Sequence, residues 1–294
     1  MIDILMATYN GEKFVEQQIK SIILQSYKDW KLIIRDDNSS DRTKDILLKY
    51  VNRYPDKIKI LDDNDHNLGI VGNFERLLQS STSEYICFCD QDDVWLSNKL
   101  EVTLDKMKIL ESKAPGAPIL VHTDMEVVDV KLNLVSKSFF KYQNINPSAN
   151  SINRLMVHNT VTGCTLMINS ELRDKAMPFP KDIVIHDWYL ALLASAYGLI
   201  DYKEEATVMY RQHGYNELGA VKYGIKYFLY ELKKILDRTN LLRSQKQAAY
   251  IKNDIAKIYS NLNEKNWFVR KFYMFKYGFY KKGFVRNIGL FLKI

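Results

Sequence analysis

The chain has 294 residues, of which 47% are hydrophobic and 26% are charged. This composition is typical of a globular protein with a sizeable core, and it excludes global disorder. The net charge of +7 is concentrated in residues 265–294, which contain eight Lys or Arg and no Asp or Glu, while the rest of the chain carries 34 basic and 35 acidic side chains. The basic character therefore needs an explanation in that segment alone.

The N-terminal sequence MIDILMATYNG has neither the basic region nor the cleavage site of a secretory signal. The longest apolar helical run, YLALLASAYGLI, is too short to span a bilayer, so we expect a cytoplasmic protein. Three cysteines, Cys87, Cys89 and Cys164, fit neither a disulfide framework nor a zinc pattern. We predict that they are thiols buried in the core.

Apolar strand patterns alternate with amphipathic helix patterns through the first hundred residues. The predicted strands are residues 2–9, 30–37, 57–61 and 85–90, and the predicted helices are residues 12–27, 38–54 and 70–78. Because these strands are apolar on both faces, the pattern predicts an α/β protein whose mostly parallel sheet is covered by helices on both sides.

The second half is less regular. The predicted strands are residues 118–129, 162–169 and 205–214, and the predicted helix at 186–198 ends at Gly198. From Tyr215 onward the pattern is helical, most clearly at 223–242 and 247–262. We find no internal repeat and no low-complexity linker.

Polar residues follow three of the predicted strands: Thr8-Tyr9-Asn10, Asp36-Asp37-Asn38 and Asp90 to Asp93. Asp and Asn are common in turns, so each group alone has a simple structural explanation. Ligands of parallel α/β sheets bind at the carboxyl ends of the strands. Three such groups at one sheet edge therefore predict a binding site; His122 and Asp124 are weaker candidates of the same kind.

The stretch CDQDDVW places three carboxylates within four positions, Asp90, Asp92 and Asp93. They could form a solvated turn, share a proton or bind a metal ion. The chain has no GxxxxGK[ST] and no GxGxxG motif, which argues against a P-loop enzyme or a dehydrogenase. Carboxylates fit an anionic phosphate only with a divalent cation between them, and alternate residues such as Asp90 and Asp92 can reach one ion.

The segments ILMATYNGEKFVEQQIKSIILQSYKDWKLIIRDDNSSDRT, NLG followed by Asn73, and FCDQDDVW resemble the inverting family 2 nucleotide-sugar glycosyltransferases of the GT-A fold. They are similar in particular to the bacterial rhamnosyltransferase-like branch that serves cell-wall and capsule polysaccharide synthesis. The resemblance covers about residues 1–215. It implies a catalytic domain at 1–215, with a nucleotide-sugar half at about 1–100 and an acceptor half at about 101–215, followed by a helical extension at 216–294.

The resemblance implies a donor site that binds a dTDP- or UDP-linked sugar. Asp37 would accept a hydrogen bond from the pyrimidine base, or would instead cap the following helix. Arg211 would contact phosphate or pair with surface carboxylates. The other implied donor-site residues are Thr8, Tyr9, Asn10, Asn67, Asn73, Asp90 and Gln91.

The implied metal site, for Mn²⁺ or Mg²⁺, consists of Asp90, Asp92 and His213. Asp92 would be the direct ligand, while Asp90 faces ribose or bound water. The alternative is that His213 has a structural role only and binds no metal. Asp93 would bind with them or cap a helix that continues through Trp95.

The implied catalytic base is Asp187 in VIHDWYLALL, which would take the proton of the acceptor hydroxyl as that oxygen attacks the anomeric carbon. The alternative is that Asp187 only caps its helix. A commoner acidic residue of the family is replaced here by His186. The implied acceptor pocket consists of Trp95, Thr162, Gly163, His186 and Trp188.

Residues 265–294 interleave ten aromatic side chains with eight basic ones. This mixture favours contact with an anionic membrane surface over packing on the catalytic domain or on a second copy in a homodimer, and over nucleic acid. The sequence thus predicts a metal-dependent inverting hexosyltransferase, rhamnosyl by resemblance, that acts on a lipid-linked glycan at the cytoplasmic membrane. The alternative is a non-catalytic nucleotide-sugar-binding or scaffold subunit.

Overall fold

The computed structural model describes residues 1–62, 66–181, 183–214, 220, 222–223, 251 and 266–293. The strands are β1 (Ile2–Thr8), β2 (Trp30–Asp36), β3 (Ile58–Ile60), β4 (Tyr85–Cys89), β5 (Val94–Trp95), β6 (Ile119–Val128), β7 (Leu134–Ser136), β8 (Met167–Asn169) and β9 (Leu199–Arg211). The helices are α1 (Val15–Ile23), α2 (Thr43–Arg53), α3 (Gly69–Ser80), α4 (Lys99–Lys113), α5 (Phe139–Tyr142), α6 (Ile152–Leu155), the 3₁₀ turn η1 (Gly163–Thr165), α7 (Ser170–Ala176), α8 (His186–Tyr197), α12 (Trp267–Lys276) and α13 (Phe284–Lys293).

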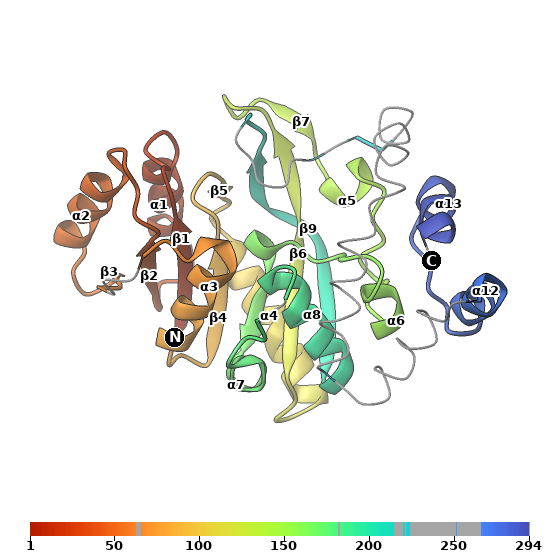
Figure 1. Cartoon of the computed structure of the whole chain (residues 1–294). Helices are drawn as coiled ribbons and strands as arrows, with labels where there is room; N and C mark the ends of the chain where they lie inside the picture. The colour runs from red at the N-terminus through yellow and green to blue at the C-terminus, as the bar shows by residue number, and fades with distance from the viewer. Residues whose placement is uncertain are drawn as a thin grey trace.

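One mixed sheet runs through the molecule in the order β3-β2-β1-β4-β8-β6-β9-β5, with β7 paired to β6 (Figure 1). The first four strands in this order are parallel, as their continuous apolar sequences predict. The short strand β8 pairs antiparallel with both β4 and β6, and so joins the two halves of the sheet. The carboxyl ends of β1, β2 and β4 therefore meet at one edge, where the predicted site lies.

Two hydrophobic clusters cover opposite faces of the sheet. On β1, Leu5 packs in the cluster that includes α3 and α8, while Ile4 and Met6 pack in the cluster that includes α1 and α4. This alternation is the period of two expected for a strand buried on both faces. The three cysteines are free and buried, which confirms the prediction of core thiols.

Two local predictions were wrong. The segment 162–169 is not a continuous strand, because the 3₁₀ turn η1 precedes the three-residue β8. The helix predicted to continue through Trp95 begins only at Lys99, and Trp95 instead lies in β5, which pairs antiparallel with β9. Pairing with a strand more than 100 residues away overrides the local sequence pattern.

The C-terminal helices α12 and α13 lie on the side of the sheet where α6 is found (Figure 1). Asn153 donates a hydrogen bond of 2.6 Å to the carbonyl of Tyr277. The Arg286 guanidinium donates to the carbonyls of Gln143 and Asn144 at 2.6 and 2.7 Å. The predicted helices at 223–242 and 247–262 lie outside the described residues. Within the described part of the chain, no helix is both long and apolar enough to cross a membrane.

Candidate active site

The loop after β1 is fixed to the loop after β2 by side chains of both. Thr8 Oγ1 donates to Asp36 Oδ1 at 2.9 Å, and the Asn10 amide donates to Ser39 Oγ at 2.8 Å. Asn10 has a φ of 47°, in the left-handed region that Asn tolerates better than most residues. The loop therefore has a defined shape at the sheet edge.

Gln91 joins the loop after β4 to the loop after β1. Its side-chain oxygen accepts from the amide of Tyr9 at 3.0 Å, and its side-chain nitrogen donates to the carbonyl of Tyr9 at 2.9 Å. A Cβ at Gly11 would lie 2.1 Å from Gln91 Oε1. Glycine at position 11 is therefore required for this close approach. Tyr9 itself is 51% exposed, so its ring is free to contact a ligand.

Asp37 is enclosed by three donors. Its Oδ1 accepts from Arg35 at 2.7 Å and from the Leu68 amide at 2.8 Å, and its Oδ2 accepts from the Gly69 amide at 2.8 Å. The carboxylate therefore caps α3, not the helix that follows it in sequence. The carboxylate is only 2% exposed, so in this conformation it has little surface for a further donor.

Asn67 and Asn73 both support this arrangement. Asn67 donates to the Asp37 carbonyl at 3.3 Å and accepts from the Gly69 amide at 3.1 Å. Asn73 is buried and accepts from Arg35 at 2.5 Å. Asn73 therefore acts through Arg35 and has little surface of its own for a ligand.

The acidic loop after β4 approaches the end of β9. His213 Nε2 lies 2.8 Å from Asp92 Oδ2, although the two residues are 121 positions apart. The imidazole ring stacks on Phe14, with 4.7 Å between ring centroids. The predicted pair of metal ligands is thus brought together.

Asp90 lies in the same loop and has a pKa raised to about 7. Burial is the main cause, followed by the negative charges of Asp92 and Asp187. No Lys or Arg forms an ion pair with Asp90, Asp92 or Asp187 among the described residues. An accumulation of carboxylates fits a divalent cation, and so do the oxygen and imidazole donors present, while the charge of Arg211 also acts on Asp92 and Asp93.

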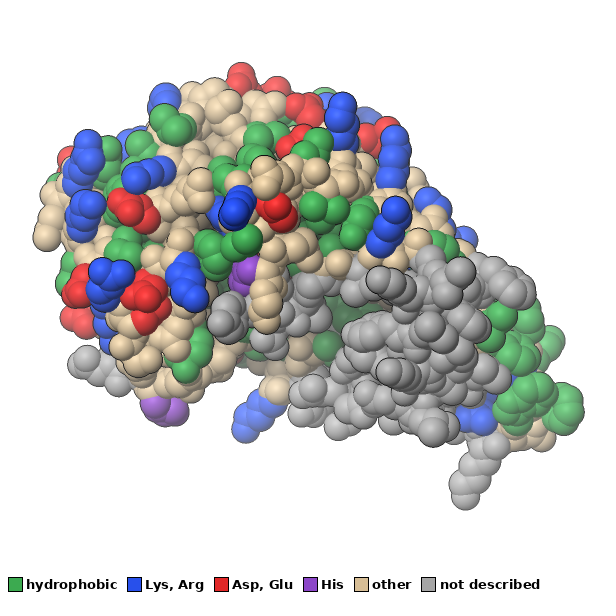
Figure 2. Space-filling view, turned by 90° about the horizontal axis from the view of Figure 1, so that it is seen from above, with side chains coloured by type: hydrophobic (Ala, Val, Ile, Leu, Met, Phe, Trp, Pro, Cys, Tyr) green, Lys and Arg blue, Asp and Glu red, His purple; other side chains and the backbone are tan. Residues whose placement is uncertain are grey.

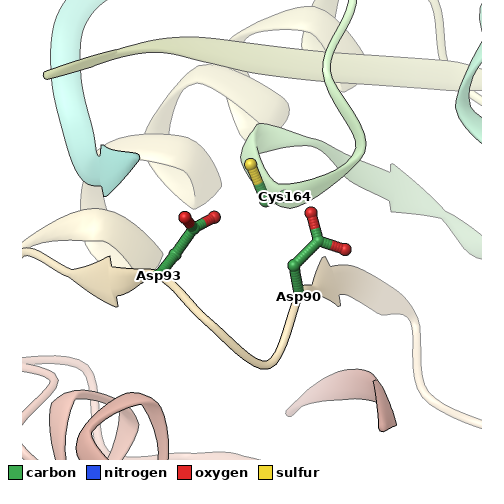
Figure 3. A group of neighbouring side chains, drawn as sticks. All are labelled: Asp90, Asp93 and Cys164. Atoms are coloured by element: carbon green, nitrogen blue, oxygen red, sulfur yellow. The ribbon is translucent and has the colours of Figure 1, made fainter. Parts of the chain in front are cut away.

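Asp93 does not cap a helix, which corrects that prediction. It is fully buried, and its Oδ1 accepts from the amide of Arg211 at 3.1 Å. Asp90, Asp93 and Cys164 converge there from the acidic loop and η1, and one potential ligand atom from each lies within 4.8 Å of the others (Figure 3). Burial raises the pKa of the Cys164 thiol well above its ordinary value. A neutral thiol is a poor ligand for Mg²⁺ or Mn²⁺, so this group fits such an ion less well than Asp90, Asp92 and His213.

Arg211 is also buried, with 3% exposure, which argues against surface pairing and leaves little access for phosphate. Its guanidinium donates to the backbone carbonyls of Asp92 and Val130, both at 2.8 Å, and to Gln17 Oε1 at 2.6 Å. It packs over the Phe14 ring. Arg211 therefore fixes the backbone of the acidic loop.

Asp187 is the second residue of α8 and is not its N-cap, which is Ile185. Its Oδ1 nevertheless accepts from the amide of Trp188 at 2.5 Å and so satisfies one amide of the first turn of the helix. Its Oδ2 accepts from the amide of Gly163 at 2.9 Å, and its Oδ1 accepts from Asn159 at 3.1 Å. Burial raises the pKa of Asp187 to about 7, although these hydrogen bonds oppose the shift. A buried carboxyl that titrates near neutral pH is well suited to act as a general base.

The five residues predicted for the acceptor pocket have different environments. Thr162 and Trp188 are half-buried, and Gly163 approaches Asp187 closely. Trp95 is 2% exposed in the hydrophobic core, which corrects its placement in a pocket. His186 is likewise buried against Phe74, with 4.0 Å between ring centroids.

Burial also lowers the pKa of His186 to about 3, so its imidazole is neutral. His186 therefore places an aromatic ring in the core beside Asp187.

Sequence reasoning missed two residues that support the site. Arg35 neutralises Asp37, and Asn159 holds Asp187. Neither residue belongs to a sequence motif that would have marked it as functional. An arginine inside an otherwise apolar strand, and an Asn in the loop before residues 162–169, were the only signals in the sequence.

Comparison with known proteins identifies the family. The model of glycosyl transferase family 2 matches residues 3–171. The chain belongs to this family. It is a glycosyltransferase, and its resemblance to the rhamnosyltransferase-like branch is confirmed: it is 30% identical over 234 residues to the dTDP-rhamnosyl transferase RfbG of Shigella flexneri, with 76% of each protein covered.

A second relative is the UDP-Glc:alpha-D-GlcNAc-diphosphoundecaprenol beta-1,3-glucosyltransferase WfgD of Escherichia coli. It is 34% identical over 107 residues, which cover 36% of this chain and 41% of WfgD.

Solved structures support the GT-A fold of this family 2 glycosyltransferase. S. aureus TarS in complex with UDP-GlcNAc superimposes with a TM-score of 0.54 at 16% identity, covering 85% of this chain and 71% of TarS. The mannosyltransferase PcManGT from Pyrobaculum calidifontis, in complex with GDP-Man and Mn²⁺, gives a TM-score of 0.57 at 14% identity, covering 92% and 72%. The predicted α/β GT-A fold with a C-terminal helical region is thereby confirmed.

Proposed function

We propose that this glycosyltransferase is a metal-dependent inverting enzyme. It transfers a hexosyl group, rhamnosyl by similarity to RfbG, from a dTDP- or UDP-sugar to a lipid-linked glycan during assembly of a bacterial surface polysaccharide. The observation that carries this proposal is the proximity of two carboxyl groups with raised pKa values. After burial and the charge of Asp92, the charge of Asp187 raises the pKa of Asp90, so the predicted base is close enough to the predicted metal site for their charges to interact.

The donor is held by the loops at the ends of β1, β2 and β4. Tyr9 presents an exposed ring at this edge, and Thr8 and Asn10 keep the loop in shape. Because Asp37 is 2% exposed and already accepts three hydrogen bonds, it would reach the N3–H of uracil or thymine only if the backbone at Leu68 and Gly69 moved. Gln91 holds the acidic loop against Tyr9, which brings the base-binding and diphosphate-binding parts together.

Asp90, Asp92 and His213 would hold Mn²⁺ or Mg²⁺. The bound cation would neutralise the charge that grows on the departing nucleoside diphosphate. Asp187 accepts the proton of the acceptor hydroxyl. The new bond joins the acceptor oxygen to the anomeric carbon while the bond from that carbon to the diphosphate oxygen breaks, and no covalent enzyme intermediate is needed.

The experiment is a transfer assay with a panel of dTDP- and UDP-sugars, a divalent cation and a membrane extract that supplies acceptors. Asp187→Asn is expected to lower transfer by about 10²–10⁴-fold, the usual contribution of a general base, and to leave donor binding intact. Asp105→Asn, an exposed carboxylate on α4, serves as the control. Normal transfer by Asp187→Asn would exclude Asp187 as the base. Donor binding without turnover by the wild type would favour the scaffold alternative.

We further propose that α12 lies on the cytoplasmic face of an anionic membrane. Phe268, Phe272 and Phe275 are 77, 61 and 57% exposed and follow i, i+4, i+7 spacing, so they form one stripe along the helix. Figure 2 shows hydrophobic side chains gathered at the edge of the molecule where α12 lies. Because residues 265–294 contain eight basic side chains and no acidic one, an anionic lipid surface complements this face better than a second copy of the chain does.

A further inference from the structure

A second concave site lies between the catalytic sheet and the C-terminal segment. It is a hollow of about 200 Å³, including the open space at its mouth. Three of its lining residues are cationic: Arg154, Lys281 and Lys282. Burial, with the nearby charges of Lys281 and Arg286, lowers the pKa of His158 well below its ordinary value, so that its imidazole is neutral. None of the residues that line the hollow is acidic. The surroundings therefore favour an anion.

The cationic side chains come from two segments that are joined by hydrogen bonds. Arg154 belongs to α6, while Lys281 and Lys282 lie between α12 and α13. The Lys282 ammonium donates to the carbonyl of Ile145 at 3.3 Å. Together with the contacts of Asn153 and Arg286 described above, this hydrogen bond holds the two halves of the hollow in place.

Thr160 gives an independent sign of a ligand. Thr160 lines the hollow and is 3% exposed, and its buried hydroxyl has no hydrogen-bond partner among the described residues. Buried hydroxyl groups are nearly always hydrogen-bonded, and a phosphate oxygen would accept from this one. The phenol of Tyr280 also lines the hollow, but it already donates a hydrogen bond to the carbonyl of Phe275 at 3.4 Å.

The hollow lies close to Asp187, and this position indicates which molecule carries the anion. His158 and Thr160 flank Asn159, and Asn159 donates to the Asp187 carboxylate at 3.1 Å. The hollow is thus one residue away from the contact that orients the predicted base. It is also formed by the segment that directly follows α12 and its phenylalanine stripe.

We propose that this hollow binds the phosphate or diphosphate group of a lipid-linked acceptor, with Arg154, Lys281 and Lys282 pairing with its charge and Thr160 donating a hydrogen bond. This inference rests on the proposed function, because it identifies where the acceptor of that reaction is held. A diphosphate bound here lies between the helix that faces the lipid and the carboxylate that takes the proton from the sugar hydroxyl.

The test is a binding titration that needs no turnover, so it is separate from the test of the proposed function. Farnesyl diphosphate is titrated in calorimetry with Mg²⁺ and saturating nucleoside diphosphate present, so that the donor site is occupied. Arg154→Gln and Lys282→Gln are each expected to weaken binding about tenfold, since each removes a charge-assisted hydrogen bond. Lys282→Arg, which keeps the charge, should restore binding, and Lys108→Gln on the exposed face of α4 should leave it unchanged.

Three results would overturn the proposal. The first is equal binding of farnesyl diphosphate by the wild type, Arg154→Gln and Lys282→Gln. The second is equal binding of farnesol, which carries no phosphate. The third concerns the source of the phosphate: if the variants bind phosphatidylglycerol vesicles less well but keep their affinity for farnesyl diphosphate, the hollow serves lipid headgroups and not the acceptor. Once an acceptor is known, the same variants should raise its KM and leave the KM of the donor unchanged.

Discussion

The side-chain amide of Asn159 donates a hydrogen bond of 3.1 Å to Oδ1 of Asp187. The bond favours the charged carboxylate and so lowers its pKa, while burial raises the pKa to about 7. The state of Asp187 near neutral pH therefore depends on burial and on the opposing hydrogen bonds from the Trp188 amide, the Gly163 amide and Asn159.

Asn159→Ala should move the acidic limb of the pH–rate profile to higher pH. A base must be deprotonated to act, so kcat/KM rises with pH through the pKa of Asp187, and loss of the hydrogen bond raises that pKa. A charge-assisted hydrogen bond is worth enough to shift the limb by about one pH unit. The rate is expected to fall at pH 6.5 and to approach the wild-type value at pH 9.

The measurement is kcat/KM between pH 5.5 and 9.5. Asn150→Ala is the matched control, because Asn150 also donates a hydrogen bond, to the carbonyl of Ile200 at 2.8 Å, but does not contact Asp187. A uniform loss of rate at all pH values in Asn159→Ala would mean that the amide only supports the loop.

Asp187→Asn should stabilise the folded protein at alkaline pH. The folded pKa of about 7 is above the ordinary value of 3.8, so folding binds a proton between these values and the free energy of unfolding falls as pH rises from about 4 to above 7. Asparagine cannot ionise and escapes this loss. The shift of about three units corresponds to at most about 4 kcal/mol.

Urea unfolding at pH 4.5 and pH 8.5 measures this difference. The stability gained by Asp187→Asn should be small at pH 4.5 and large at pH 8.5, while Asp105→Asn on the exposed face of α4 should show no such change. An equal effect at both pH values would disprove the link between the buried charge and stability.

The strands and their ends were predictable because their signals are local. Continuous apolar runs identified β1, β2 and β4, and the polar residues that follow each run had to meet at one edge of a parallel sheet. The meeting of Asp92 and His213 was expected from the family resemblance alone, because 121 residues separate them.

The contacts that decide the roles of Asp93, Trp95 and Arg211 were not predictable in this way. An arginine near an acidic loop could equally contact phosphate, but pairing between β5 and β9 buries its guanidinium against the carbonyls of that loop. The same pairing places Trp95 in the core and brings Asp93 to the Arg211 amide. Such contacts depend on the tertiary arrangement, which has no local signature in the sequence.

His213→Ala should raise the concentration of Mn²⁺ or Mg²⁺ needed for half-maximal activity. The imidazole nitrogen lies 2.8 Å from the Asp92 carboxylate, and the ring is fixed by stacking on Phe14. Loss of the ring removes one metal ligand and leaves the second ligand, Asp92, without its hydrogen-bond partner. Changes around a metal ligand usually cost 10–100-fold in affinity, and we expect at least about tenfold here. His66→Ala, at an exposed histidine, is the control. Superimposable metal titrations for His213→Ala and the wild type would remove His213 from the site.

The phenylalanine stripe of α12 predicts a measurable affinity for anionic vesicles. Each fully buried Phe side chain contributes about 1.5–3 kcal/mol, so replacing Phe268, Phe272 and Phe275 by Ser should lower partitioning onto phosphatidylglycerol vesicles by more than about tenfold, even if insertion is partial. Wild-type binding should weaken in 0.5 M salt and on neutral phosphatidylcholine vesicles, because the basic side chains of residues 265–294 supply the rest of the attraction. Co-sedimentation measures both effects.

Leu24→Ser, at a residue 69% exposed on the C-cap of α1, controls for the loss of an exposed apolar side chain elsewhere. If the triple variant sediments with vesicles as the wild type does, α12 is not the membrane contact, and its stripe must be covered by protein instead.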